Sequence, residues 1–342
     1  MSEKTNIQWA DHTGSPWFGC TEVNEDCANC YARELAKGRM ERLFRDAYKK
    51  TGVENAATRS VWGKGAPRIR SKSFWSDARK WNNTPWVCDA CGTATALPAN
   101  CQRTVFTCSH CNVVTQHHRA RMFPSLCDWL DEEAPIEWFA DFLQLIFETH
   151  NLIWMLLTKR PELWRERLCK VSNRILSERM AGWDRADRVR VNAWISDWLN
   201  GTAPKNVWIF VSASNQKNAD LMIPHGLAIP AVIHGVSAEP LLGPIDFEKA
   251  AEKAAGVSDV DMIIFGGEST QGKPARRCNM EWIRSGVQQC KAAGVKAYVK
   301  QLGSNPFADG GLRLNLKDKK GGDINEWPGD LRVREWPEAA YQ

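Results

Sequence analysis

The second half of the chain alternates short apolar segments with helical ones, and this alternation limits the possible folds more than any other feature. The strand candidates are residues 120–126, 152–158, 207–212, 231–237, 262–266 and 297–301. The stretches with helical spacing are 136–148, 161–199, 216–221 and 280–293. Strands that alternate with helices form a parallel sheet. We therefore predict an α/β fold, a full or partial (β/α) barrel.

Five of the apolar segments end in small or polar residues, and in β/α barrels function collects at these carboxyl ends. The cofactor-binding candidates among them are Lys159, Ser212, Ser237, Gly266, Gly267 and Glu268. The catalytic candidates are Glu239, Glu268 and Lys300. The two glycines allow close backbone approach to a ligand. The alternative is that Glu239 pairs with Lys300, or Glu268 with Lys159, inside the barrel mouth.

Three cysteines stand close together near the N-terminus as Cys20-x6-Cys27-x2-Cys30, followed by Tyr31. Three thiolates on one short loop can hold three irons of a [4Fe–4S] cluster and leave the fourth iron for a non-protein ligand. A structural zinc site needs a fourth protein ligand, for which His12 is the nearby candidate. The remaining alternative is a loop of reduced thiols without a metal. A helix is predicted from residue 28 onward, with apolar residues at helical spacing up to residue 47.

A second group, Cys88-x2-Cys91 and Cys108-x2-Cys111, has the spacing of a zinc ribbon, in which two knuckles supply four thiolates. We predict structural Zn²⁺ here, with a rubredoxin-like iron or an auxiliary iron–sulfur cluster as alternatives. Such a small module has too little core to fold alone, so the metal supplies its folding energy. Cys101, between the knuckles, is interpreted as a bystander.

The other cysteines receive weaker interpretations. Cys278 is a candidate hydrogen donor or thiyl at the pocket, although most lone cysteines are inert. Cys127, Cys169 and Cys290 are interpreted as small core fillers.

The composition is that of an ordinary globular protein, with 43% hydrophobic and 25% charged residues. No apolar run is long enough for a membrane span, and the N-terminus has no export signal. Twelve cysteines then indicate metal binding in a reducing cytoplasm rather than disulfides. We expect a monomer. Its expected parts are a cluster-binding segment at 1–82, a zinc-ribbon insertion at 83–118, the rest of the barrel at 119–303, and a tail at 304–342 that packs on the barrel.

Basic residues concentrate in two segments. Residues 59–82 carry seven Lys or Arg against one acid, and residues 159–205 carry eleven against six, with four tryptophans among them. Basic patches interleaved with aromatics suit a phosphate backbone and stacked bases. The alternative is a solvated helical face whose tryptophans point into the core.

The chain resembles a known family in several motifs. They are TNIQWADHTGSPWFGCTEVNEDCANCYA (5–32), WMLLTKRPE (154–162), NVWIFVSASNQ (206–216), SAEPLLGPIDF (237–247), FGGES (265–269), YVKQLG (298–303) and GGDINEWPGDLRVREWP (321–337). In order and content they resemble the phage Gp37/Gp68 family (DUF5131), a radical S-adenosylmethionine-like group. The cysteine spacing departs from the commonest radical-SAM pattern, which has three residues and then two between its cysteines.

The resemblance implies a radical-SAM type of barrel with a [4Fe–4S] cluster on Cys20, Cys27 and Cys30, and with Tyr31 at the cofactor site. It implies that S-adenosylmethionine binds the open iron and that a cellular reductant such as flavodoxin drives formation of a 5′-deoxyadenosyl radical. The chemistry belongs to the cofactor, while the protein orients the reacting atoms. Family members mostly lack the ribbon, which is therefore interpreted as an insertion that grips nucleic acid or a partner, or as a strut.

The basic segments and the phage setting favour DNA or a modified nucleoside as substrate, in the host cytoplasm if the chain is phage-encoded. The most specific hypothesis is an isomerase that rearranges an amino-acid adduct on the 5-methyl carbon of thymine during DNA hypermodification. A base-repair lyase resembling photoproduct lyases is the alternative within the enzyme class. A non-catalytic, metal-stabilised nucleic-acid-binding protein is the alternative outside it, and action on a protein or free nucleotide is a third possibility.

Overall fold

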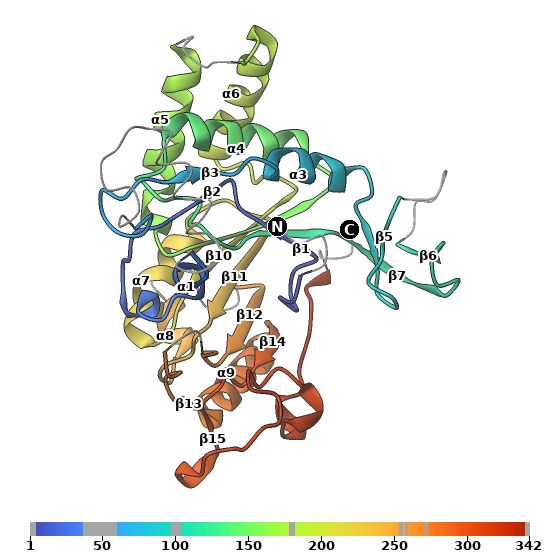
Figure 1. The fold of residues 1–342 in the computed structure, drawn as a ribbon, viewed down its shortest axis with the longest axis vertical. Helices are drawn as coiled ribbons and strands as arrows, with labels where there is room; N and C mark the ends of the chain where they lie inside the picture. Colours follow the sequence, from blue (N-terminus) through green and yellow to red (C-terminus); the bar gives the residue numbers. More distant parts are fainter. Residues whose placement is uncertain are drawn as a thin grey trace.

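The computed structural model describes residues 5–36, 60–96, 104–177, 182–252, 256, 259–270 and 273–338. At its centre is a seven-stranded sheet with strand order β1-β8-β9-β10-β11-β12-β14, in which every neighbouring pair is parallel. The strands are β1 (His12–Gly14), β8 (Arg121–Pro124), β9 (Ile153–Thr158), β10 (Val207–Ser212), β11 (Ile233–Ala238), β12 (Met262–Gly266) and β14 (Lys296–Gln301). The sheet is curled into a half-barrel, so the predicted α/β fold with a partial barrel is confirmed (Figure 1).

Both faces of this sheet are buried, which is why its strands are continuous apolar runs in the sequence. Successive side chains of a strand point to opposite faces. In β10, Val207 and Ile209 therefore join the apolar cluster under the outer helices, whereas Trp208 and Phe210 join the cluster on the inner face. The inner cluster also contains Met155, Ile264 and Tyr298 from neighbouring strands.

Helices cover the outer face of the half-barrel in two groups. The first group is α3 (Phe74–Asn82), α4 (Ile136–Glu148), α5 (Trp164–Leu176) and α6 (Arg185–Leu199), and the second is α7 (Gln216–Leu227), α8 (Phe247–Ala251) and α9 (Met280–Ala293). None of the described helices has both the length and the apolar character that a membrane crossing requires.

Two predicted helical stretches differ from the observed ones. The stretch 161–199 is divided into a 3₁₀ turn, η3 (Pro161–Leu163), followed by α5 and α6. Gly182 has a positive φ of 84°, and the Asp184 side chain caps α6 by accepting from the Asp187 backbone N–H, so a new helix begins there. Helix α7 runs to Leu227, six residues beyond the predicted end at 221. The helix predicted from residue 28 begins three residues later, as α1 (Tyr31–Leu35), and its expected continuation to residue 47 lies outside the described residues.

The chain after β14 packs on both faces of the half-barrel. Trp327 and Leu331 are buried on the outer face, in the apolar cluster under α7, α8 and α9. Trp336 packs on the inner side, with its ring 5.4 Å from that of Tyr298 and 3.5 Å from the Arg121 guanidinium carbon. The short elements of this region are β15 (Pro306–Phe307), η5 (Asp309–Gly311), η6 (Ile324–Glu326) and η7 (Gly329–Leu331). Strand β15 pairs with β13 (Cys278–Asn279), which precedes α9.

A separate antiparallel sheet carries the second cysteine group and projects from the side of the half-barrel (Figure 1). Its strand order is β5-β4-β7-β6. The strands are β4 (Trp86–Cys88), β5 (Ala94–Thr95), β6 (Val105–Thr107) and β7 (Val114–Arg119). We call this sheet with its turns the four-cysteine module. A two-stranded pair, β2 (Trp17–Phe18) and β3 (Ile69–Arg70), lies near the N-terminal cysteine loop.

Gly267, directly after β12, is required by backbone packing. A Cβ atom there would lie 2.2 Å from the carbonyl oxygen of Leu302, and backbone cannot move aside as a side chain can. We expect Gly267→Ala to destabilise the fold by about 1–3 kcal/mol, the usual cost of overpacking. Gly329→Ala is the matched control, because no heavy atom lies within 4 Å of its added Cβ. Urea unfolding of both variants measures this loss of stability, and equal unfolding midpoints for Gly267→Ala and Gly329→Ala would contradict the prediction.

Candidate functional site

The carboxyl ends of the strands place several predicted residues on the inner face of the half-barrel. Because alternate residues share a face, Ser212 follows Phe210, and Lys300 follows Tyr298, on the inner side. Ser212 and Ser237 are register partners in β10 and β11, and both are buried. The Ser212 hydroxyl has no hydrogen-bond partner among the described residues. A buried hydroxyl without a partner is available to a ligand.

Glu239 and Lys300 form an ion pair across the end of β12, so this predicted alternative is observed. Each side chain is 15% exposed. The Glu239 side chain of this pair lies close to Gly266, where an added Cβ atom would be 3.2 Å from it. Gly266 thus makes room for a charged side chain of its own protein.

Glu268 pairs with Arg276 rather than with Lys159. Its carboxylate accepts from the Arg276 guanidinium at 2.6 Å, the Arg276 backbone N–H at 2.8 Å and the Asn29 side-chain amide at 2.8 Å. Burial alone would raise the pKa of Glu268, but these hydrogen bonds and the Arg276 charge lower it below its usual value. Since Asn29 lies between Cys27 and Cys30, Glu268 fixes the N-terminal cysteine loop to the sheet.

The three N-terminal cysteines line one cavity at this end of the sheet. Cys20, Cys27 and Cys30 border a space of about 110 Å³, together with Lys159 and Arg160 from the end of β9. The loop between the cysteines contains the 3₁₀ turn η1 (Glu25–Cys27) and leads into α1.

Buried polar contacts hold this loop in place. Asp26 is 5% exposed and accepts hydrogen bonds from the Ser214 hydroxyl and, at 3.0 Å, from the Asn218 amide. The Cys20 carbonyl accepts from the Gly63 N–H at 2.9 Å. The cavity is therefore built by loops on both sides, and its thiols are held by the tertiary fold.

Two basic side chains border the thiols. One Arg160 Nη lies 2.9 Å from the Asp128 carboxylate and 3.6 Å from the Cys20 sulfur. Burial lowers the pKa of Lys159, but the negative groups around it, first Cys27 and Asp26, outweigh this and raise it. Burial raises the pKa of the Cys20 thiol to about 12, so a metal binding there must displace its proton.

The two cysteine groups differ in spacing. A single zinc ion holds its sulfurs at about 2.3 Å, so two such sulfurs lie at most about 4.6 Å apart. Among the described residues, one group of His, Cys, Asp and Glu has all its ligand atoms within 4.8 Å, and it is Cys88, Cys91, Cys108 and Cys111. The ligand atoms of Cys20, Cys27 and Cys30 do not all lie within this distance of one another.

The four sulfurs of the module lie close enough to bind one metal ion. The distances from Cys88 to Cys111 and from Cys91 to Cys108 are both 3.8 Å. Each knuckle closes in the same way: the N–H of Gly92 donates to the Cys88 carbonyl at 2.8 Å, and that of Asn112 to the Cys108 carbonyl at 2.9 Å. Both closing residues have positive φ, which explains Gly at one position and Asn at the other.

His118 connects the module to the half-barrel. One of its ring nitrogens lies 2.6 Å from Asp89 in the first knuckle, and the other lies 3.1 Å from Asp11, next to β1. The module is therefore joined to the sheet by a buried contact as well as by the chain.

The remaining predicted residues have different surroundings. The Tyr31 hydroxyl donates to the Ser125 carbonyl at 2.5 Å, and Tyr31 lines the cavity.

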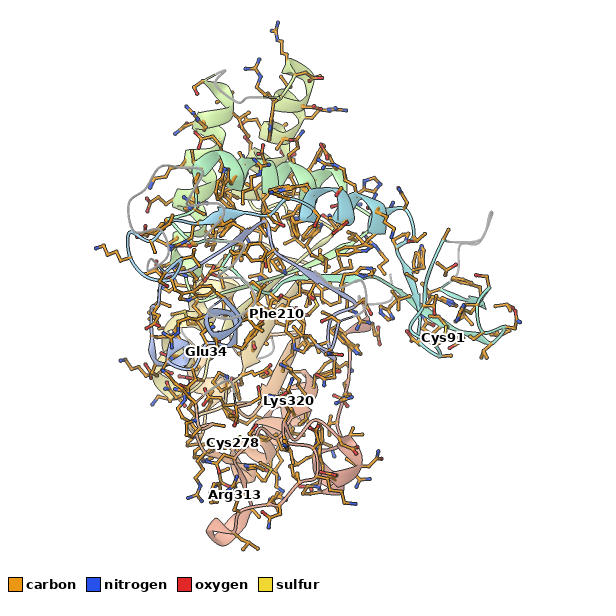
Figure 2. All side chains as sticks on the ribbon, viewed as in Figure 1. Glu34, Cys91, Phe210, Cys278, Arg313 and Lys320 are labelled. Atoms are coloured by element: carbon orange, nitrogen blue, oxygen red, sulfur yellow. The ribbon has the colours of Figure 1, made fainter. Side chains whose placement is uncertain are left out.

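Cys278 is 1% exposed in the outer apolar cluster and does not line the cavity, and Figure 2 shows it well separated from Cys91 of the module. Cys290 is a buried core residue as predicted, whereas Cys169 is exposed, so its interpretation as a core filler was wrong. Cys127 lines the cavity, which the sequence did not indicate.

The basic segments are less available for nucleic acid than their composition indicates. Trp164, Trp183 and Trp198 are buried in the outer cluster, as the alternative interpretation held. In the other segment, three arginines pair with acids from distant parts of the chain. These pairs are Arg68–Asp131, Arg70–Asp141 and Arg79–Glu148.

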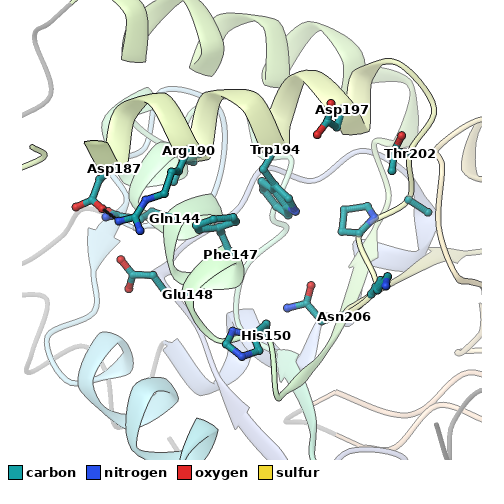
Figure 3. A pocket seen from close by; sticks show the side chains of 14 residues that line it. Gln144, Phe147, Glu148, His150, Asp187, Arg190, Trp194, Asp197, Thr202 and Asn206 are labelled. Atoms are coloured by element: carbon teal, nitrogen blue, oxygen red, sulfur yellow. Dashed lines mark hydrogen bonds and ion pairs between the residues drawn. The ribbon is translucent and has the colours of Figure 1, made fainter. Parts of the chain in front are cut away.

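A second hollow, of about 610 Å³, lies between α4 and α6 (Figure 3). Phe147 and Trp194 face each other there, with His150 and Asn206 below them in the view. His150 precedes β9 and Asn206 precedes β10, so this hollow is at the amino ends of the strands. In β/α barrels the functional residues gather at the opposite, carboxyl ends. We therefore take the smaller cysteine-lined cavity as the candidate site.

The fold and this site define a protein of the α/β half-barrel class with a cysteine-lined cavity and a projecting four-cysteine module. A family model described as "Protein of unknown function (DUF5131)" matches residues 4–326, and the chain therefore belongs to this family. The membership in DUF5131 that the motifs predicted is thereby confirmed, while the radical-SAM character of the chain stays a prediction. No curated protein and no solved structure matches the chain significantly.

Proposed function

We propose that this protein is a radical S-adenosylmethionine enzyme that modifies a nucleic-acid base. One observation carries the proposal: Cys20, Cys27 and Cys30 line a single cavity at the carboxyl ends of the half-barrel strands. Three thiolates satisfy three irons of a [4Fe–4S] cluster and leave one iron free. The cavity of about 110 Å³ is smaller than the usual small-molecule pocket, so it would hold the compact cluster alone, and S-adenosylmethionine would bind beside it at the neighbouring strand ends.

Two basic residues that line the cavity, and further residues at the neighbouring strand ends that do not line it, then have roles. When bound, the cluster and S-adenosylmethionine would supply a 5′-deoxyadenosyl radical for hydrogen abstraction. Lys159 and Arg160 offset negative charge beside the thiolates. Glu268 acts as a positioning residue, because Asn29 and Arg276 already satisfy its carboxylate. The amino, carboxylate and hydroxyl groups of the cofactor would meet Glu239, Lys300, and the serine hydroxyls at the ends of β10 and β11.

For the substrate, we propose a DNA base, and most specifically an amino-acid adduct on the 5-methyl carbon of thymine that is rearranged by an isomerase reaction. Such a base must leave the duplex stack to reach an enzyme cavity. The four-cysteine module, as a zinc ribbon projecting from the half-barrel, would provide an additional contact to the nucleic acid. An external one-electron donor such as flavodoxin is required.

Replacement of one loop cysteine tests the class of enzyme. We expect the full-length protein, reconstituted anaerobically with iron and sulfide, to gain an absorbance shoulder near the visible range from the cluster held by its thiolates. Cys27→Ala should lose most of this absorbance, because it removes one of the three loop thiolates that would hold the cluster. Cys169→Ala is the matched control, since this thiol is exposed and outside the cavity.

Product analysis tests the reaction itself. With S-adenosylmethionine and reductant, the wild type should release 5′-deoxyadenosine, and nucleoside mass analysis of phage-modified DNA should reveal the altered base. A Cys27→Ala variant that keeps the spectrum of the wild type would sink the proposal and favour a non-catalytic nucleic-acid-binding protein.

A further inference from the structure

The cysteine-lined cavity has a fourth thiol. Cys127 lies on its wall with Cys20, Cys27 and Cys30, although it comes from a different part of the chain. It follows β8 by three residues, and so stands at the carboxyl end of a strand that neighbours β1 in the sheet. One side of Cys127 packs on the outer apolar cluster, while the other contributes to the cavity.

The segment that carries Cys127 is held rigidly at this place. The Ser125 N–H donates to the Gly14 carbonyl at 3.0 Å, and the Leu126 N–H donates to the Ser15 hydroxyl at 2.7 Å. These bonds extend the pairing of β8 with β1 beyond the strand ends. On the other side of Cys127, the Asp128 carboxylate accepts from the Thr158 hydroxyl at 2.8 Å and from Arg160 at 2.9 Å.

The same segment is tied directly to the cysteine loop. Tyr31, the residue after Cys30, donates its hydroxyl hydrogen to the Ser125 carbonyl at 2.5 Å. Arg160 links Asp128, the residue after Cys127, to the Cys20 sulfur at 3.6 Å and to the Thr21 carbonyl. The fold thus connects Cys127 to both ends of the loop that carries the other three thiols.

We propose that Cys127 is a fourth ligand of the cavity and binds the iron that Cys20, Cys27 and Cys30 leave open while S-adenosylmethionine is absent. This inference rests on the proposed function. The Cys127 thiol loses its proton to solvent and forms an iron–sulfur bond. When the cofactor binds, that bond breaks, the sulfur regains a proton, and the cofactor takes its place on the iron. No electron is transferred in this exchange.

The consequence is a competition between one protein thiol and the cofactor for one coordination position. The apparent affinity for a ligand is proportional to the fraction of protein molecules that are competent to bind it. If Cys127 occupies the iron in about nine of ten molecules, its removal strengthens cofactor binding about tenfold. The closed form also protects the cluster from solvent oxidants, because no iron position is left open.

The experiment compares full-length wild type, Cys127→Ala and Cys127→Ser after anaerobic reconstitution. Iron and sulfide analysis, electron paramagnetic resonance of the reduced cluster without cofactor, and the S-adenosylmethionine dissociation constant are measured. We expect both variants to keep the iron content of the wild type, to show a changed resonance spectrum without cofactor, and to bind the cofactor about tenfold more tightly. Cys290→Ala is the matched control, because this thiol is buried in the core away from the cavity.

The outcomes separate this inference from the function on which it rests. Unchanged spectra and dissociation constants in both Cys127 variants, with iron retained, would overturn the role of Cys127 alone. A wild type that takes up no iron–sulfur cluster would overturn both proposals. A wild-type cluster whose spectrum responds to Cys127→Ala but not to S-adenosylmethionine would support Cys127 as a ligand and overturn the radical chemistry. Circular dichroism checks folding, and Cys127→Ser, whose side chain is closer in size to cysteine than alanine is, replaces the alanine variant if that variant does not fold.

Discussion

Cys111→Ser is expected to remove one equivalent of metal from the protein and to unfold the four-cysteine module while the half-barrel stays folded. In its described residues the module has little core of its own: three of its four strands have only two or three residues, and Val105 and Val114 are exposed. Structural zinc, the metal predicted for this module, contributes about 10–16 kcal/mol in comparable small modules, so losing one thiolate should remove most of the folding energy. Metal analysis and amide hydrogen exchange of β4 and β7 measure the effect.

The control for this prediction is Cys169→Ser, which replaces an exposed thiol of α5 and should leave metal content and exchange unchanged. Exchange in β9 and β10 should be unaffected in both variants, because these strands are buried in the clusters of the half-barrel. A Cys111→Ser protein that keeps its full metal content and protected β4 amides would show that three thiolates suffice, or that the module folds without metal.

The second large effect is expected at a buried ion pair beside the cysteine loop. The side chains of Arg68 and Asp131 are both 0% exposed, and their charged groups lie 2.5 Å apart. Arg68 also donates to the Thr21 hydroxyl at 2.7 Å and to the Ala66 carbonyl at 2.6 Å. Arg68→Ala leaves the Asp131 carboxylate buried without its cation, which should destabilise the protein by about 3–5 kcal/mol.

Arg79→Ala provides the matched control for Arg68. Arg79 also pairs with a carboxylate, that of Glu148 at 2.8 Å, but its side chain is 49% exposed. Removing an exposed pair costs about 0–1 kcal/mol, because water replaces the lost interaction. In urea unfolding, the midpoint of Arg68→Ala should therefore be clearly lower than that of the wild type, and the midpoint of Arg79→Ala should be nearly unchanged. Similar midpoints for the two variants would mean that solvent reaches Asp131.

The half-barrel could be predicted because the burial of its strands on both faces requires apolar sequences that are recognisable without the structure. The segments Ile153–Thr158 and Val207–Ser212 are apolar almost without interruption, as strands buried on both faces must be. The break between α5 and α6 was missed although Gly182 and Asp184 mark it. To predict such a break from the sequence, one turn-forming residue must be given more weight than the many helix-forming residues around it.

The pairing of charged residues could not be predicted in the same way. Arg68 and Asp131 are 63 positions apart, and the local composition around Arg68 indicates only a basic segment. Glu268 was assigned to a ligand, yet Arg276 and Asn29 satisfy it. The choice of partner depends on which loops meet at the sheet edge.

The sequence by itself determined six of the seven half-barrel strands, the family and the two cysteine patterns, because these follow from apolar runs and motifs along the chain. It did not indicate the edge strand β1. Only the tertiary structure decided that Cys127 shares a cavity with Cys20, Cys27 and Cys30, and that most tryptophans of the basic segment are core. Those facts depend on how a curled sheet brings strand ends together. Spacing along the chain does not encode that geometry.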